Sequence, residues 1–185
     1  MPFGYPLFVG LRVVFGIVTV LGIGAPFLEA ATGKVVWPLS LRDGLPTTIP
    51  GYVAAPRDPL PDTDENEMGV YTQVSRFFQR IESPTSVKQF QLVVQDYGAG
   101  KDLAGAIKKA VAEAGRAPAV EAKEVKVAGL PAFAVTDRSG PNPTTLVTVV
   151  ATPGRLVLAQ GANVDRDEAL KLLALVDFVR VVNAK

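Results

Sequence analysis

An acidic run, DTDENE, begins at Asp62 and is the part of this sequence that most resembles a metal-binding loop. Asp62, Asp64 and Asn66 stand at alternate positions, as the first ligands of an EF-hand calcium loop do. That loop also needs a glycine at its sixth position and a glutamate at its twelfth, where this sequence has Glu67 and Gln73. No metal site is therefore expected, and the run is interpreted as a solvated acidic turn. Its carboxylates are candidate contacts for a basic surface of a partner protein: Asp62, Asp64, Glu65 and Glu67.

A second run, Gly98-Ala99-Gly100-Lys101, resembles the end of a phosphate-binding loop. The complete motif has a further glycine five residues before the last one, and a serine or threonine directly after the lysine. Gln95 and Asp102 stand at those two positions. The run therefore predicts a turn between a strand and a helix rather than a nucleotide site.

Two amino-acid types that carry much of enzyme chemistry are missing, because the chain contains no histidine and no cysteine. Histidine is the usual general base near neutral pH, and cysteine supplies thiolate nucleophiles and disulfides. Paired carboxylates or a serine–lysine dyad remain as catalytic groups, but none stands in a distinctive motif. The chain is therefore predicted to be no enzyme and to hold no cofactor. Its 19 Lys and Arg against 18 Asp and Glu give a net charge of +1, which argues against a nucleic-acid partner.

An uncharged stretch, Val13–Leu28, sets the expected location of the chain. A helix needs roughly 20 apolar residues to cross a bilayer, a length reached if Leu7–Leu11 joins and Arg12 extends to the headgroups. We therefore predict a transmembrane helix within an anchor domain, residues 1–33. Arg12 predicts a cytoplasmic N-terminus, a single pass, and a periplasmic or other extracytoplasmic location for most of the chain. The predicted anchor residues are Arg12, Val13, Phe15, Ile17, Val20, Leu21, Phe27, Leu28 and Trp37.

Two other interpretations of the apolar stretch stay open. Ala31-Thr32-Gly33 offers small residues for signal-peptide cleavage before Lys34, although Arg12 is the single positive charge that precedes the stretch. The stretch could also be a buried helix of a globular domain. The anchor and the signal peptide both place the domain outside the cytoplasm.

Residues 34–69 are rich in proline, which fixes φ and lacks a backbone donor. We predict an extended tether for this segment, followed by an extracytoplasmic α+β domain at residues 70–185. The prolines of the segment are Pro38, Pro46, Pro50, Pro56, Pro59 and Pro61.

Strand-like and helix-like patterns follow one another after the predicted tether. Phe90, Leu92 and Val94 face one way, which predicts a strand with one solvated face. The residues that face the other way are Gln89, Gln91 and Gln95. Asp165, with Glu168 three residues on, predicts the start of the last helix. The predicted strands are 70–81, 87–97, 120–127, 132–136, 144–152, 155–160 and a short one at 178–182, and the first helix is 101–114. This order predicts an α+β fold, an antiparallel sheet with two packed helices.

The second half of the chain is similar to a known family. The run VKVAGLPAFAVTD contains a turn at Gly129–Phe133, a long hairpin follows at Thr144–Gln160, and a last helix leads to Asp177-Phe178. Over residues 70–182 this pattern resembles the PsbP/Mog1-like superfamily, although the Asp177-Phe178 pair departs from the family's terminal Ser-Phe type of segment. The resemblance implies a PsbP/Mog1-like fold and a non-catalytic, extrinsic role on the lumenal side of photosynthetic complexes. No binding residue is transferred by it.

Two function classes follow from these observations. We expect a membrane-anchored accessory or assembly subunit that stabilises an integral energy-transducing complex, photosynthetic or respiratory, from the extracytoplasmic side. Its partners would be integral membrane subunits and the lipid bilayer. The alternative is a periplasmic solute- or cell-envelope-binding module, which should show a pocket without a reactive group. The aromatic residues available to line such a pocket are Tyr52, Tyr71, Phe77, Phe78 and Tyr97.

Overall fold

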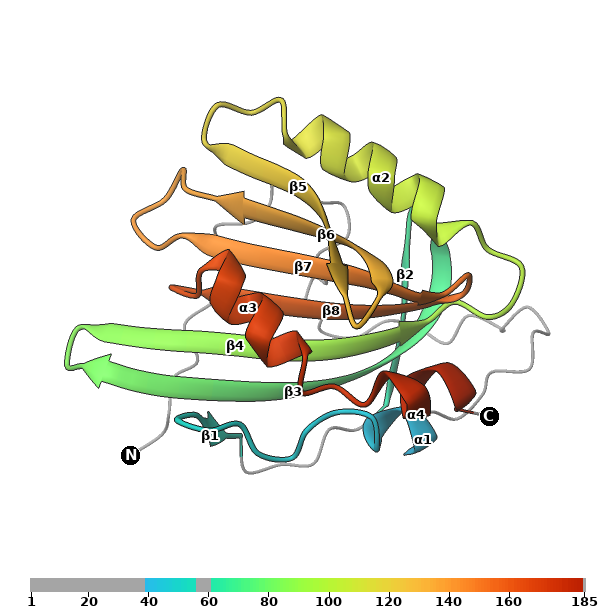
Figure 1. The fold of residues 1–185 in the computed structure, drawn as a ribbon, viewed down its shortest axis with the longest axis horizontal. Helices are drawn as coiled ribbons and strands as arrows, with labels where there is room; N and C mark the ends of the chain where they lie inside the picture. The colour runs from blue at the N-terminus through green and yellow to red at the C-terminus, as the bar shows by residue number, and fades with distance from the viewer. Residues whose placement is uncertain (1–38, 56–60, 185) are drawn as a thin grey trace.

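The computed structural model of the chain describes residues 39–55 and 61–184, which form one sheet with helices packed on it (Figure 1). The helices are α1 (Leu39–Arg42), α2 (Leu103–Ala114), α3 (Arg166–Leu173) and α4 (Phe178–Asn183). The strands are β1 (Val53–Ala54), β2 (Asp62–Asn66), β3 (Gly69–Ser83), β4 (Ser86–Asp96), β5 (Val120–Val127), β6 (Leu130–Asp137), β7 (Thr144–Thr152) and β8 (Arg155–Ala162). The predicted α+β class and antiparallel sheet are confirmed.

The sheet has eight strands, and seven of them follow the order β1-β3-β4-β8-β7-β6-β5, while β2 pairs with β3. All of these pairings are antiparallel. The predicted hairpin of β7 and β8 is confirmed at its Pro153-Gly154 turn. Only glycine fits at residue 154, because a Cβ there would overlap the carbonyl group of Gly98. That close approach lets Tyr97 N donate to Gly154 O at 2.8 Å.

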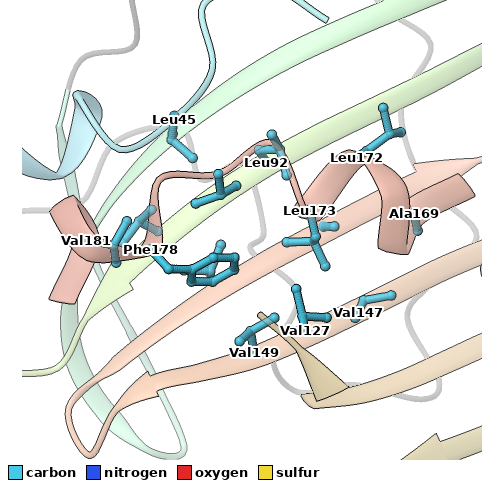
Figure 2. Close-up of a cluster of buried hydrophobic side chains, with 14 of the residues drawn as sticks. Leu45, Leu92, Val127, Val147, Val149, Ala169, Leu172, Leu173, Phe178 and Val181 are labelled. Atoms are coloured by element: carbon cyan, nitrogen blue, oxygen red, sulfur yellow. The ribbon is translucent and has the colours of Figure 1, made fainter. Parts of the chain in front are cut away.

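Each face of the sheet carries its own hydrophobic core. Alternate side chains of a strand point to opposite faces, so Phe90, Leu92 and Val94 join one core while Val93 joins the other. The first core lies under α1, α3 and α4, and Figure 2 shows part of it around Leu173. The second core includes the apolar stripe of α2, which packs chiefly on β5 and β6. The prediction that β4 has one solvated face is therefore wrong at its carboxyl end, since a second layer covers it.

Aspartate side chains cap both long helices, and Asp165 is the one of the two that the sequence predicted as a cap. Asp102 Oδ1 accepts from Gly105 N at 3.1 Å ahead of α2, and Asp165 Oδ1 accepts from Glu168 N at 2.8 Å ahead of α3. A carboxylate at this position satisfies a backbone donor that has no partner within the helix. Both helix predictions are confirmed.

The predicted strand at 178–182 is wrong, because this segment is the helix α4. Its valines favour a strand by local propensity, but Asp177 Oδ1 accepts from Arg180 N at 3.0 Å and caps a helix instead. Phe178 and Val181, three residues apart, are both buried against the sheet. Burial at helical spacing therefore outweighs the strand preference of the β-branched residues.

The interpretation of residues 34–69 as a tether is corrected for the part that the structure describes. Leu41, Leu45 and Ile49 are buried in the first core, so residues 39–55 pack as part of the domain. The acidic run is also different from the predicted turn, because Asp62–Asn66 is the strand β2. The proline content predicted an extended chain. That prediction did not take into account the leucines and the isoleucine between the prolines, which are buried in the first core.

No helix within residues 39–55 and 61–184 is long and apolar enough to cross a membrane. The predicted anchor residues, from Arg12 to Trp37, lie outside the described residues.

Candidate functional site

The acidic residues singled out from the sequence lie along β2 and in the turn that joins it to β3. Asp62, Glu65 and Glu67 are exposed, whereas Asp64 is half-buried and its Oδ2 accepts from Tyr71 OH at 3.4 Å. The carboxylates of Asp62 and Asp64 also each accept from the backbone N–H of the next residue. No group of three or more metal-ligating residues occurs in the part of the chain that the structure describes. The exposed carboxylates are therefore available to a partner, while Asp64 is engaged inside the domain.

A polar cluster lies where β2 and the amino end of β3 meet the carboxyl end of β4. Asn66 Nδ2 donates to Tyr97 OH at 2.7 Å, and Tyr97 OH donates to Gln95 Oε1 at 3.2 Å. The rings of Tyr71 and Tyr97 contact each other in a tilted arrangement, with their centroids 4.9 Å apart and their planes at 34°. Burial raises the pKa of Tyr97 to about 12, because it disfavours the charged phenolate. The cluster ties β2 to the sheet and contains no group poised to take a proton.

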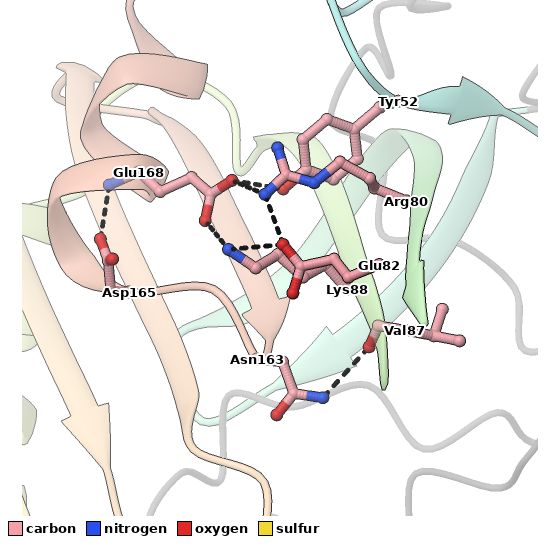
Figure 3. Close-up of polar contacts among 8 residues, drawn as sticks. All are labelled: Tyr52, Arg80, Glu82, Val87, Lys88, Asn163, Asp165 and Glu168. Atoms are coloured by element: carbon pink, nitrogen blue, oxygen red, sulfur yellow. Dashed lines mark hydrogen bonds and ion pairs between the residues drawn. The ribbon is translucent and has the colours of Figure 1, made fainter. Parts of the chain in front are cut away.

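A second polar cluster joins the segment before β1 to the β3–β4 hairpin and to α3 (Figure 3). Glu168 Oε1 accepts from Tyr52 OH at 2.9 Å and pairs with Arg80 at 3.0 Å. Its other oxygen, Oε2, lies 2.6 Å from Lys88 Nζ. Glu82 completes the network, 2.9 Å from Arg80 and 3.4 Å from Lys88. Two cations and two carboxylates neutralise one another here. We therefore interpret the cluster as a structural contact that holds Tyr52, the β3–β4 hairpin and α3 together.

The pKa values of this second cluster follow from its contacts. The hydrogen bond to Glu168 raises the pKa of Lys88, and burial together with the Glu168 hydrogen bond raises the pKa of Tyr52. The hydrogen bond from Arg80 lowers the pKa of Glu82. The shifts favour protonated Tyr52 and Lys88, which donate to Glu168, and ionised Glu82, which accepts from Arg80.

The free energy of unfolding is expected to fall as the pH rises above about 10. Tyr52, Tyr97 and Lys88 have raised pKa values in the folded chain, so the stability that they contribute is complete below their unfolded pKa values. It is lost as the pH climbs toward the folded values, at no more than about 1.4 kcal/mol per pH unit for each group. Urea unfolding followed by circular dichroism between pH 7 and pH 11 would measure this slope. A Tyr52→Phe, Tyr97→Phe chain with an unchanged slope would contradict the assignment.

The glycine–lysine run occupies the connection from β4 to α2. Gly98 and Gly100 adopt positive φ values of 77° and 86°, and Lys101 Nζ donates to the carbonyl oxygen of Met68 at 3.3 Å. Asp102 is the cap of α2. The run is thus the strand-to-helix turn that the sequence predicted.

The aromatic residues considered for a ligand pocket do not line one common wall. Phe77 and Phe78 are neighbours on β3 and point to opposite faces, so Phe78 is buried while Phe77 is exposed. Tyr52 lies beside Phe90 in the first core, and its centroid is 6.4 Å from the Phe90 ring. The tyrosines of the second core lie on the other face of the sheet. These residues are therefore divided between the two faces.

An uncharged surface on β1, β3 and β4 is the most distinctive exposed feature of the described residues. Gln79 of β3 stands opposite Val53 of β1 and Gln89 of β4, and Phe77 stands opposite Gln91. Val53 is 66% exposed, Phe77 50% and Ile81 71%. We refer to this set as the β1–β3–β4 surface: Val53, Phe77, Gln79, Ile81, Gln89 and Gln91.

Charge is absent from a wider part of the same face. On β3 and β4, every second residue points to the same face as Phe77, and the side chains at these positions are uncharged. They are Gln73, Ser75, Phe77, Gln79, Ile81, Val87, Gln89, Gln91, Val93 and Gln95. The opposite face of the same two strands carries the ion pair between Arg80 and Glu82 and the cation of Lys88. Val93 and Gln95, at the carboxyl end of β4, are buried under the second layer. The exposed remainder is aromatic and aliphatic and lacks charge, as the core of a protein interface does.

Parts of this surface are visible in the sequence, but their proximity is not. Alternation places the glutamines of β4 on one face, and Phe77 is predicted from the sequence only as a candidate pocket residue. Ile81 and Val53 were not singled out, because the pairing of β1 with β3 is not visible in the sequence. The signal that was present is the run of uncharged alternate positions on two adjacent strands.

No protein-family model and no curated protein matches this chain.

Proposed function

We propose that this chain is a non-catalytic, membrane-anchored accessory or assembly subunit that binds integral membrane subunits from the extracytoplasmic side. The observation that carries the proposal is the β1–β3–β4 surface, which exposes Phe77 and Ile81 in an uncharged setting. Water leaves such a surface readily, and its glutamine amides offer hydrogen bonds that set the register of a partner. The partner of this surface is an extramembrane part of an integral membrane protein complex.

Three further features support a binding role over a catalytic one. The ionisable groups of the Glu168 cluster are matched in charge and geometry. The phenol of Tyr97 is engaged within the domain, where it contacts Asn66 and Gln95. The chain has no histidine and no cysteine to serve as base or nucleophile.

The membrane attachment rests on the uncharged stretch Val13–Leu28, and the type of complex rests on the resemblance to PsbP/Mog1-like proteins. Both point to the same setting, a domain held near the membrane beside an energy-transducing complex. The exposed carboxylates of β2, which are Asp62 and Glu65, and Glu67 in the turn after it, are a second contact that would suit a basic partner surface.

The test isolates the full chain, tagged at its C-terminus, from native membranes in mild detergent and quantifies the integral subunits that accompany it. We expect Phe77→Asp to reduce their recovery by about 30-fold, because a central interface side chain contributes about 2 kcal/mol. Leu175→Asp is the matched control, since Leu175 is 45% exposed in the turn between α3 and α4, outside both proposed contacts. It should leave the recovery unchanged.

The same experiment separates the alternatives. Equal loss with Phe77→Asp and Leu175→Asp would reject the β1–β3–β4 surface. Unchanged recovery after Asp62→Lys with Glu65→Lys would reject the acidic contact alone. Isolation of the wild-type chain without any integral subunit would reject the accessory role and direct attention to a solute- or cell-envelope-binding module.

A further inference from the structure

We infer that the partner of the β1–β3–β4 surface contacts the domain through an uncharged segment that lies across the strands, and that this contact continues onto β8 and the start of β7. The inference rests on the proposed function, because it describes the partner of the same surface. Its basis is the register of five adjacent strands, which aligns uncharged side chains in two rows on one face of the sheet.

The first row continues the β1–β3–β4 surface across the sheet. Gln79 stands opposite Val53 on one side and Gln89 on the other. Gln89 stands opposite Ala162 of β8, which stands opposite Thr144 at the start of β7. Residues that are opposite one another in paired strands point to the same face. Neighbouring strands are about 4.8 Å apart, so the row from β1 to β7 is about 19 Å long.

The second row runs beside the first. Phe77 stands opposite Gln91, and Gln91 stands opposite Gln160 of β8. Gln160 stands opposite Leu146 of β7, which is buried in the second core. Gln91 and Gln160 are half-buried, and α2 packs chiefly on β5 and β6, at the edge of the sheet away from β3 (Figure 1). The second row is therefore accessible from Phe77 to Gln160.

No charged side chain belongs to either row between β1 and β7. The first row reaches a charged side chain only on β6, at Asp137. The charged side chains at the hairpin end of β3 and β4, which are Arg80, Glu82 and Lys88, point to the opposite face. They are paired with one another and with Glu168 of α3. A charged partner residue set against the rows would lose water without gaining an opposite charge, so the matching partner segment is uncharged.

The glutamines of this face specify what the partner segment offers. Gln95 Nε2 donates to Gln73 Oε1 at 3.4 Å, so these two amides bind each other. Within residues 39–55 and 61–184, the side-chain amides of the other four make no hydrogen bond: Gln79, Gln89, Gln91 and Gln160. Each free amide has two donors and two acceptor positions. The partner segment therefore presents backbone amides, hydroxyls or side-chain amides to them, beside an apolar residue that packs on Phe77.

Charge substitutions of both signs test the inference in the co-purification of the full chain with integral subunits. Gln79→Glu, Gln79→Lys, Gln160→Glu and Gln160→Lys should each reduce the recovery by about tenfold, because either charge would be buried without an opposite charge. Asn183→Glu and Asn183→Lys are the matched controls, since Asn183 is exposed on α4, which packs on the other face of the sheet. They change the net charge equally and should leave the recovery unchanged.

Each outcome supports or overturns the inference. If one sign of charge lowers the recovery and the other keeps or raises it, the partner segment is charged and the inference is overturned. Loss at Gln79 without loss at Gln160, or no loss at either, also overturns it and leaves the accessory role in place. A wild-type chain that recovers no integral subunit overturns the accessory role and the inference together. Urea unfolding followed by circular dichroism verifies that the variants fold, and Thr144→Glu with Thr144→Lys replaces the Gln160 pair if that pair unfolds the domain.

Discussion

Replacement of Arg155 by methionine is expected to lower the free energy of unfolding by about 3 kcal/mol or more. Arg155 Nε lies 2.8 Å from Asp96 Oδ2, and the two side chains are only 13% and 10% exposed. Arg155 also donates to the carbonyl oxygens of Val181 and Val182 at the end of α4. Methionine has a similar volume but no donors, so a nearly buried carboxylate and two helix-terminal carbonyls lose this partner.

Urea unfolding of the full chain in mild detergent, followed by circular dichroism, measures the effect. The matched control is Arg116→Met, which removes an exposed pair with Glu113 one turn away on the surface. That change should cost less than about 0.5 kcal/mol. Equal stabilities of the two variants would mean that Arg155 does not fasten α4 to the sheet.

Truncation of Leu41 to alanine is expected to destabilise the domain by about 2–5 kcal/mol. Leu41 on α1 is fully buried in the first core, and α1 packs against both α4 and β3. Removing its branched end leaves a cavity that neighbouring side chains fill only in part. A tether draped over a surface would make no such contribution, so the size of the effect separates the two descriptions of this segment.

Leu175→Ala is the control for this truncation, because it removes the same atoms from a side chain that is exposed. Its free energy of unfolding should stay within about 0.5 kcal/mol of the wild type. If Leu41→Ala also stayed within that limit, residues 39–55 would not be part of the cooperative core. The comparison uses the same urea unfolding of the full chain.

Much of the secondary structure could be predicted from short stretches of sequence. Side-chain alternation located β4, and Asp165 with Glu168 three residues on located the start of α3. These signals depend on residues within a few positions of one another, where backbone geometry links side-chain direction to spacing. The same local logic failed at residues 178–182, because a strand propensity of isolated valines is weaker than burial on a neighbouring layer.

The candidate surfaces were less predictable, because their residues come together only through pairing of distant segments. The pairing of β1 with β3 brings Val53 to the same surface as Phe77 and Ile81. The strand β1 lies in the segment that was predicted to be a tether. The acidic run stays a predicted contact surface, and its formation of a strand in place of the predicted turn follows from its pairing with β3. No pattern within the acidic run indicates that β3 is the strand it pairs with.

The sequence shows which segments carry charge, and the fold decides which charged groups meet. Composition alone excluded histidine and cysteine chemistry, and the alternating glutamines of β4 already marked one face of that strand as uncharged. Folding then chose the partners: Tyr52 and Glu168, 116 residues apart, meet in a hydrogen bond of 2.9 Å. Such a contact depends on how layers pack and on which surfaces they leave open. Local spacing therefore specifies the elements, and long-range burial specifies which of their faces remain exposed to bind.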